Sequence, residues 1–134
     1  MQPSKVLVID DSSLIHRMFK VMLPKSTLVF AFDGREALGR LAEHPDVDLI
    51  FLDINMPNMN GLEFLAQVKA DAALARIPVI IVSTEGKEED TLRGLRAGAA
   101  AYVKKPFRNE IVMELMRKVL DKSAGAPPAE GMVR

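Results

Sequence analysis

Short apolar runs alternate along the chain with longer segments in which apolar residues recur at helical spacing. A short run of β-branched and apolar residues is typical of a buried strand, whereas spacings of three and four residues indicate one face of a helix. The pattern predicts strands at Lys5–Ile9, Thr27–Phe32, Asp48–Asp53, Pro78–Ser83 and Ala100–Lys104. A helical pattern follows each of them, and this alternation predicts an α/β domain.

The helical segments show which side of each helix should face the sheet. In the first, Ile15, Met18, Phe19 and Met22 lie on one face, and Pro24 ends the helix. In the last, Arg108–Lys122, we expect Ile111, Leu115 and Val119 to face inward. The other three helices carry end signals: the second starts at Asp33, the third at Asn60 with Glu63, and the polar fourth, Lys87–Ala97, ends at Gly98.

Five strands that alternate with five helices predict a doubly wound, five-stranded parallel sheet with helices on both faces. The hydrophobic pattern does not give the order of the strands. Residues 1–122 are long enough for a single domain with one ordinary core. The last segment, 123–134, lacks periodicity and is rich in Ala, Pro and Gly, so we expect a disordered tail there.

Composition narrows the function classes. Eighteen basic and eighteen acidic residues cancel, so no overall charge favours nucleic acid or an anionic membrane. The chain has no cysteine, no signal-peptide pattern and no apolar run long enough to span a bilayer, which together favour a cytoplasmic protein without membrane insertion. The two histidines, His16 and His44, have no metal-ligand company in the sequence, and we expect both on the surface.

Chemically useful side chains gather where the expected strands end. Asp10 and Asp11 follow the first strand, Asp53 ends the third, Ser83 ends the fourth, and Lys105 follows the fifth. Each of these residues, taken alone, has an ordinary structural explanation, such as helix capping or a solvated lysine. In an open α/β sheet, however, ligands bind beyond the carboxyl ends of the strands. The shared location therefore predicts a binding site.

Three neighbouring carboxylates repel one another, so they should either raise a pKa or hold a hard cation such as Mg²⁺. A cation there would offset the repulsion between Asp53 and an anionic phosphoryl group, and an aspartate can itself be the nucleophile. Lys105 could reach the phosphoryl oxygens, and the hydroxyl of Ser83 could donate a hydrogen bond to them. A cation-dependent phosphate site is the leading interpretation.

Five segments, in this order and spacing, resemble the receiver domain of two-component response regulators, most closely the stand-alone, CheY-like chemotaxis type. The resemblance covers about residues 5–122 and implies the flavodoxin-like receiver fold. It rests on Val8-Ile9-Asp10-Asp11-Ser12, Asp53-Ile54-Asn55-Met56-Pro57 with Gly61, Pro78-Val79-Ile80-Ile81-Val82-Ser83, Ala97-Gly98-Ala99 and Tyr102-Val103-Lys104-Lys105-Pro106-Phe107.

The resemblance implies a role for each matching residue. Asp53 would accept phosphate from a histidine kinase, and Asp10, Asp11, Asp53 and the backbone carbonyl of Asn55 would surround Mg²⁺. Lys105 would contact the phosphate and would be followed by a cis peptide bond to Pro106. Ser83 and Tyr102 would be the switch residues that change the face formed by Lys87–Ala97, Ala100–Lys104 and Arg108–Lys122, where a downstream target binds.

The resemblance also implies what kind of protein this is. It would not be an enzyme, beyond promoting its own phosphorylation and dephosphorylation, and it would be a monomer or a weak, phosphorylation-dependent dimer. Two alternatives stay open: a pseudo-receiver that is never phosphorylated and acts only as an interaction module, and a phosphatase with an aspartate nucleophile. That phosphatase family needs a second aspartate where this chain has Asn55. We also expect no DNA-binding role, because such regulators need an output domain and the residues printed after Lys122 do not form one.

Overall fold

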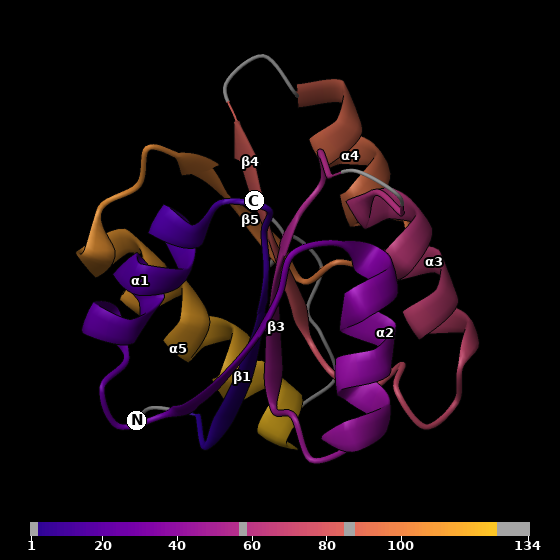
Figure 1. Cartoon of the computed structure of the whole chain (residues 1–134), viewed down its shortest axis with the longest axis horizontal. Helices are drawn as coiled ribbons and strands as arrows, with labels where there is room; N and C mark the ends of the chain where they lie inside the picture. The colour runs from indigo at the N-terminus through magenta and orange to yellow at the C-terminus, as the bar shows by residue number, and fades with distance from the viewer. Residues whose placement is uncertain (1–2, 57–58, 85–87, 126–134) are drawn as a thin grey trace.

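In the computed structural model, which describes residues 3–56, 59–84 and 88–125, five strands alternate with five helices (Figure 1). The predicted α/β alternation is therefore confirmed, with strand boundaries that differ from the prediction by at most one residue and helix α5 ending three residues later than predicted. The elements are β1 (Lys5–Ile9), α1 (Ser13–Met22), β2 (Thr27–Ala31), α2 (Gly34–Glu43), β3 (Leu49–Asp53), α3 (Gly61–Ala70), β4 (Val79–Thr84), α4 (Glu88–Arg96), β5 (Ala101–Lys105) and α5 (Asn109–Gly125).

The strands form one parallel sheet in the order β2-β1-β3-β4-β5. This is a doubly wound, flavodoxin-like arrangement, as the resemblance described above implies. The chain moves outward from β1 to β2 and then crosses back to β3, so the direction of winding changes between β1 and β3. Ligands of such sheets bind at that switch point, beyond the carboxyl ends of the strands. The topology therefore places the ends of β1 and β3 at the expected binding edge.

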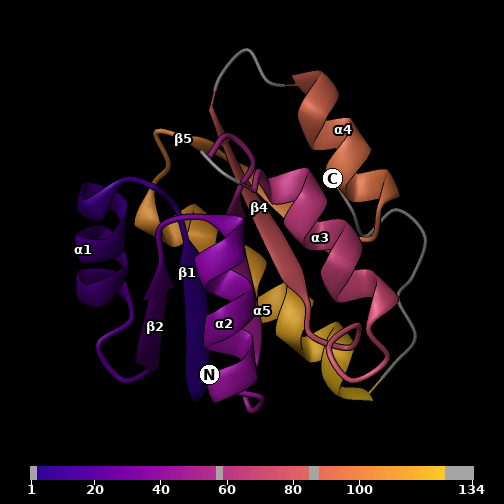
Figure 2. The same cartoon turned by 45° about the vertical axis from the view of Figure 1, so that its right-hand side comes forward.

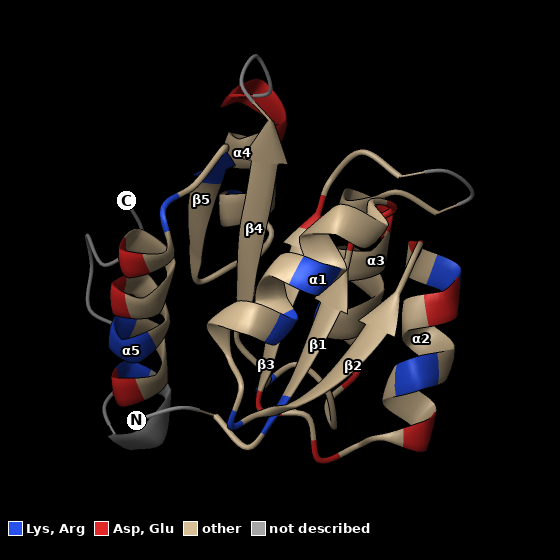
Figure 3. Cartoon of the chain, turned by 60° about the vertical axis from the view of Figure 1, so that its left-hand side comes forward, with Lys and Arg blue, Asp and Glu red and all other residues tan. Residues whose placement is uncertain are grey.

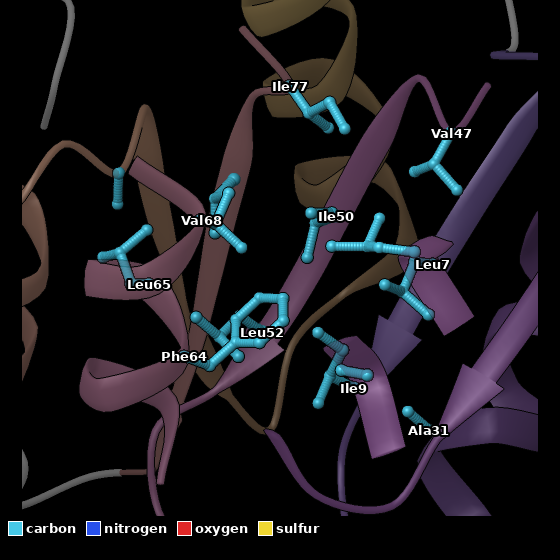
Figure 4. Close-up of a cluster of buried hydrophobic side chains, with 14 of the residues drawn as sticks. Leu7, Ile9, Ala31, Val47, Ile50, Leu52, Phe64, Leu65, Val68 and Ile77 are labelled. Atoms are coloured by element: carbon cyan, nitrogen blue, oxygen red, sulfur yellow. The ribbon is translucent and has the colours of Figure 1, made fainter. Parts of the chain in front are cut away.

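Each face of the sheet has its own hydrophobic core (Figures 1 and 2). Helices α1 and α5 cover one face, where Phe19, Phe51 and Met116 are among the buried residues. Helices α2, α3 and α4 cover the other face, where Leu7, Ile50, Phe64 and Val68 interdigitate (Figure 4). All five residues of β3 are buried, as its continuous apolar run predicts for a central parallel strand.

The predicted helix ends are also found. Asn60 and Glu63 form a capping box at the start of α3, and Gly98 follows α4 with a φ of +116°, a left-handed conformation that favours glycine. The predicted start of the fourth helix at residue 87 lies outside the described residues, as do residues 126–134 of the predicted tail. No helix in the described part of the chain has the length and apolar character needed to cross a membrane.

Two sequence expectations about side chains are wrong. Ile111, which we expected to face inward, is 51% exposed, and its neighbour Val112 is buried instead; Val119 is buried as predicted, and Leu115 is partly buried against the same core. His16 is only 5% exposed, with its ring stacked on Phe30 at a centroid distance of 4.7 Å. A neutral imidazole is a flat, largely apolar ring, which is why an aromatic cluster can bury it.

Candidate functional site

Three aspartates meet at the carboxyl ends of two neighbouring strands. Asp53 is the last residue of β3, and Asp10 and Asp11 directly follow β1, which pairs with β3. One carboxylate oxygen of each aspartate can be chosen so that all three lie within 4.8 Å of one another. Asp10 and Asp53 are 1% and 4% exposed, and Asp11 lies at the solvent side. The sheet thus builds a small acidic pocket with one open side.

Backbone hydrogen bonds fix the two buried carboxylates. The N–H of Ser12 donates to Oδ1 of Asp10 over 2.9 Å, and Ser12 in turn is the N-cap of α1. The N–H of Asp10 donates to the carbonyl of Ala31 on β2. On the other strand, the N–H of Asn55 donates to Oδ1 of Asp53 over 3.4 Å. The second oxygen of each carboxylate, Oδ2, faces the ammonium group of Lys105 instead.

Lys105 supplies the one cation that the described residues place among these acids. It is the last residue of β5, and its Nζ lies 2.8 Å from Oδ2 of Asp10 and 3.8 Å from Oδ2 of Asp53. This buried oxygen has no hydrogen-bond partner among the described residues, so the ion pair with Lys105 is its polar contact there. The peptide bond from Lys105 to Pro106 is cis, as the family resemblance predicted.

It is electrostatically unfavourable for Asp10 and Asp53 to be ionised together when no metal ion lies between them. Burial, and after it the charge of Asp10, raise the pKa of Asp53 from its ordinary 3.8 to about 6, because Lys105 only partly opposes them. A hard divalent cation would relieve this repulsion, and carboxylate oxygens are the ligands that Mg²⁺ prefers. The donor set, its spacing and the poorly partnered Asp10 oxygen therefore fit a magnesium-type site.

Two further predicted site residues, Ser83 and Tyr102, are placed differently relative to the acids. Ser83 is buried at the end of β4, one position past Val82, which pairs with Asp53 across the sheet. Tyr102 is half-buried on β5 and does not join the acidic pocket. It lines a separate cavity of about 260 Å³ between α4 and β5, together with Glu88, Thr91, Leu92, Leu95 and Lys104.

Gly61 shapes the loop below Asp53. Its N–H donates to the carbonyl of Ile54, and a β-carbon there would collide with the carbonyl oxygen of Asp53 and lie 2.7 Å from the Cα of Ile54. Only glycine permits this close approach of α3 to the end of β3. The loop and the helix therefore hold Asp53 from behind.

The sequence interpretation missed His16 as a neighbour of the site. Its ring lies next to the backbone carbonyls of Asp10 and Ala31, which favour the protonated imidazole, although burial is the larger effect and lowers its pKa. One signal of burial was present: His16 stands three residues before Phe19, on the same helical stripe.

Comparisons with known proteins agree with this geometry. The family model described as the response regulator receiver domain matches residues 6–119. A chemotaxis protein CheY homolog of Campylobacter jejuni is 36% identical over 129 residues, which cover 94% of this chain and 99% of the relative. Chemotaxis protein CheY1 of Helicobacter pylori is 35% identical over 119 residues, covering 87% and 96%.

A solved structure shares both the fold and part of the sequence. The chemotaxis response regulator CheY4 of Vibrio cholerae superposes with a TM-score of 0.79 and 34% identity over 89% of this chain and all of that one. The family match spans both strands that carry the acids and the strand that carries Lys105. The chain therefore belongs to the response regulator receiver domains, a family of signalling proteins rather than of conventional enzymes.

Proposed function

We propose that this protein is a single-domain response regulator in which Mg²⁺-dependent transfer of a phosphoryl group to Asp53 changes the surface that partners recognise. The observation that carries the proposal is the meeting of Asp10, Asp11 and Asp53 with Lys105 at adjacent strand ends. This arrangement supplies a nucleophile, a cation site and a fixed positive charge within one pocket. Transfer of an anionic group needs all three.

The residues that would hold Mg²⁺ are Asp11, Asp53 and the backbone carbonyl of Asn55, with Asp10 acting through water. When bound, the cation would neutralise the charge that builds up between the carboxylate and the incoming phosphoryl group. The chain's own residues supply the geometry. Ser12 and Asn55 hold the two buried carboxylates through their backbone N–H groups.

The chemical step is a displacement at phosphorus. A carboxylate oxygen of Asp53 attacks, an O–P bond forms as the P–N bond of a phosphohistidine breaks, and the histidine nitrogen leaves with the bonding pair and takes up a proton. Lys105 then has a phosphoryl oxygen as an alternative to Asp10, and Ser83 has an acceptor for its hydroxyl proton. The new charge thus favours an arrangement of the β4 and β5 ends that differs from the unphosphorylated one.

The switched surface would be the face of α4, β5 and α5. Tyr102 lies at the cavity between α4 and β5, two positions after Ala100 and three before Lys105. An inward turn of its ring would follow a movement of Ser83 toward the phosphate, and the altered cavity would then accept a downstream target protein. The phosphodonor would be a histidine kinase, and the setting would be the cytoplasm.

A chemotaxis-like pathway is the finer form of this proposal. The two curated relatives described above carry chemotaxis names, and this chain matches each over most of its length. The charge balance and the absence of basic clusters give no support for nucleic acid as the partner. We expect a monomer or a weak dimer that forms on phosphorylation. Phosphotransfer profiling against the host's purified histidine kinases, sampled at short times, would identify the pathway.

Incubation with acetyl phosphate tests the proposal without a kinase. Intact-mass spectrometry should show the addition of one phosphoryl group that requires Mg²⁺, is removed by hydroxylamine and is absent from Asp53→Asn. A folded wild-type protein that binds Mg²⁺ but is never labelled, by acetyl phosphate or by any kinase, would instead favour the pseudo-receiver alternative. Steady release of phosphate from unrelated phosphoesters would favour the phosphatase.

A further inference from the structure

His16 is a buried imidazole that the proposed reaction does not use. Its ring is stacked on Phe30 (centroid distance 4.7 Å, interplanar angle 22°) and tilted against Phe32 (4.6 Å, 50°). Phe30 belongs to β2 and Phe32 directly follows it, whereas His16 lies in the first turn of α1. The ring therefore joins the beginning of α1 to the carboxyl end of β2.

The turn that carries Asp10 and Asp11 lies between these two elements. On one side, the N–H of Asp10 donates to the carbonyl of Ala31, at the end of β2. On the other side, Ser12 donates to the Asp10 carboxylate, and the N–H of His16 donates to the carbonyl of Ser12. The acids are thus attached to β2 and to α1, and the His16 ring keeps those two supports apart.

The ring adds no charge to the site, and it contacts the turn directly, because the backbone carbonyls of Asp10 and Ala31 lie next to it. Its Nε2 atom is enclosed and forms no hydrogen bond within the described residues. Burial lowers the pKa of the imidazole, so at neutral pH the ring adds no positive charge beside the acids. A flat aromatic ring packed against two phenylalanines is a stiff spacer, because it has few rotamers and contacts both of them.

We propose that His16 is a positioning residue for the cation site: its ring, wedged against Phe30 and Phe32, sets where the turn presents Asp10 and Asp11. The inference rests on the proposed function, because it concerns the affinity of the same site for Mg²⁺. Loss of the ring would let the start of α1 close toward β2 and would misplace both carboxylates. Supports of this kind around metal ligands change affinity by about tenfold or more.

The test is the dissociation constant for Mg²⁺, measured by isothermal titration calorimetry on four variants at a temperature where circular dichroism shows each to be folded. His16→Ala and His16→Gln remove the ring and should weaken binding by about tenfold. His16→Phe keeps a flat ring of similar size and should stay within about twofold of the wild type. Met22→Ala is the matched control, because Met22 is buried on the same helix at its far end.

A purely structural role predicts a different pattern. Met22→Ala should lower the free energy of unfolding as His16→Ala does, yet leave Mg²⁺ affinity unchanged. Wild-type affinity in both His16→Gln and His16→Ala, or equal losses in His16→Phe and Met22→Ala, would overturn the positioning role. If His16→Ala does not fold, the contrast between His16→Gln and His16→Phe decides. A wild-type protein that binds no Mg²⁺ would refute the proposed function as well, so the two failures are distinguishable.

Discussion

The ammonium group of Lys105 lies 2.8 Å from Oδ2 of Asp10. Its distance to the nearest oxygen of Asp53 is 3.8 Å, a full ångström longer. The lysine thus neutralises the acid that would not accept phosphate, and Asp53 stays the less compensated carboxylate. Burial and the charge of Asp10 consequently raise the pKa of Asp53 to about 6. Without a metal, the ammonium group of Lys105 balances the charge of Asp10. A bound metal ion would take over this role, and Lys105 could then pair with a phosphoryl group.

Replacement of this lysine should strengthen metal binding. Lys105→Met removes one positive charge from the pocket, so the dissociation constant for Mg²⁺ should fall on the order of tenfold, equivalent to about 1.4 kcal/mol. Lys104→Met is the matched control: it removes the same charge one residue earlier, where the side chain pairs with Glu88 over 3.1 Å instead of with the acids. Calorimetric titration of both variants gives the comparison. Equal affinities in Lys105→Met and the wild type would contradict the pairing described above.

The raised pKa of Asp53 makes stability depend on pH in the absence of metal. The carboxyl group of Asp53 binds its proton more tightly in the folded state than in the unfolded state. This difference stabilises the fold fully below pH 3.8, and the stabilisation is lost as the pH rises through about 6. Ionised Asp53 then costs on the order of 2–3 kcal/mol of folding free energy. The free energy of unfolding, measured by urea denaturation with EDTA at pH 7.5, should therefore be higher for Asp53→Asn than for the wild type.

The same comparison contains its own controls. At about pH 4 the two proteins should differ little, since the wild-type carboxyl group is then protonated in the folded state. Saturating Mg²⁺ at pH 7.5 should stabilise the wild type much more than Asp53→Asn, because the variant lacks one ligand. A stability difference that is constant from pH 4 to pH 8 would show that Asp53 has an ordinary pKa.

A pair of glycine variants tests the support behind Asp53. Gly61→Ala places a methyl group against the backbone of Asp53 and Ile54 and should cost about 1–3 kcal/mol, with slower phosphoryl labelling. Gly39→Ala lies in the interior of α2 with no atom within 4 Å of the new methyl group, and should gain about 0.5–1 kcal/mol. Denaturant unfolding measures both. A Gly61→Ala protein as stable and as readily labelled as the wild type would exclude this role for the glycine.

The proposed switch can be tested optically at Tyr102, because the chain has one tyrosine and no tryptophan. Its ring borders the cavity between α4 and β5. Addition of Mg²⁺ and beryllofluoride, a phosphoryl mimic, should make tyrosine emission less sensitive to quenching by acrylamide as the ring turns inward. Asp53→Asn should show no change, and Tyr102→Phe should remove the signal. Unaltered quenching in the wild type would remove Tyr102 from the switch.

The exposed sides of α2 and α5 carry many charged residues. Figure 3 shows acidic and basic bands alternating along α2 and α5. On α5, Lys118 and Glu114 form an (i, i+4) pair at 3.9 Å, and both side chains are more than half exposed. Exposed pairs of this kind contribute about 0–1 kcal/mol each. The buried faces of these helices therefore contribute more to stability than the exposed ion pairs do.

The positions of the acids could be predicted from the sequence because they depend on local rules. The four apolar residues Leu49–Leu52 are typical of a central parallel strand in an alternating α/β pattern, and Asp53, which follows them, then lies at the binding edge. The burial of His16 could not be predicted in the same way, because it depends on two phenylalanines of another strand. The prediction that Ile111 faces inward failed for a related reason. Ile111 and Val112 are neighbours, and only packing against the sheet decides which of the two is buried.

The choice of Lys105 between two aspartates is also a tertiary property. The sequence indicates that a lysine and three acids share one edge of the sheet. The distances from Nζ of Lys105 to Asp10 (2.8 Å) and to Asp53 (3.8 Å), however, depend on how far each of β1, β3 and β5 extends at that edge. Periodicity carries no information about such offsets. Site composition was therefore predictable, whereas the partner of each group was not.

A crystal structure of the protein with Mg²⁺ and beryllofluoride tests the central claim most directly. We predict beryllofluoride bonded to a carboxylate oxygen of Asp53, Mg²⁺ ligated by Asp11, Asp53 and the carbonyl of Asn55, and Lys105 shifted from Asp10 onto a fluorine atom. A pocket without either group, or beryllofluoride bound elsewhere with Lys105 still paired to Asp10, would contradict the account.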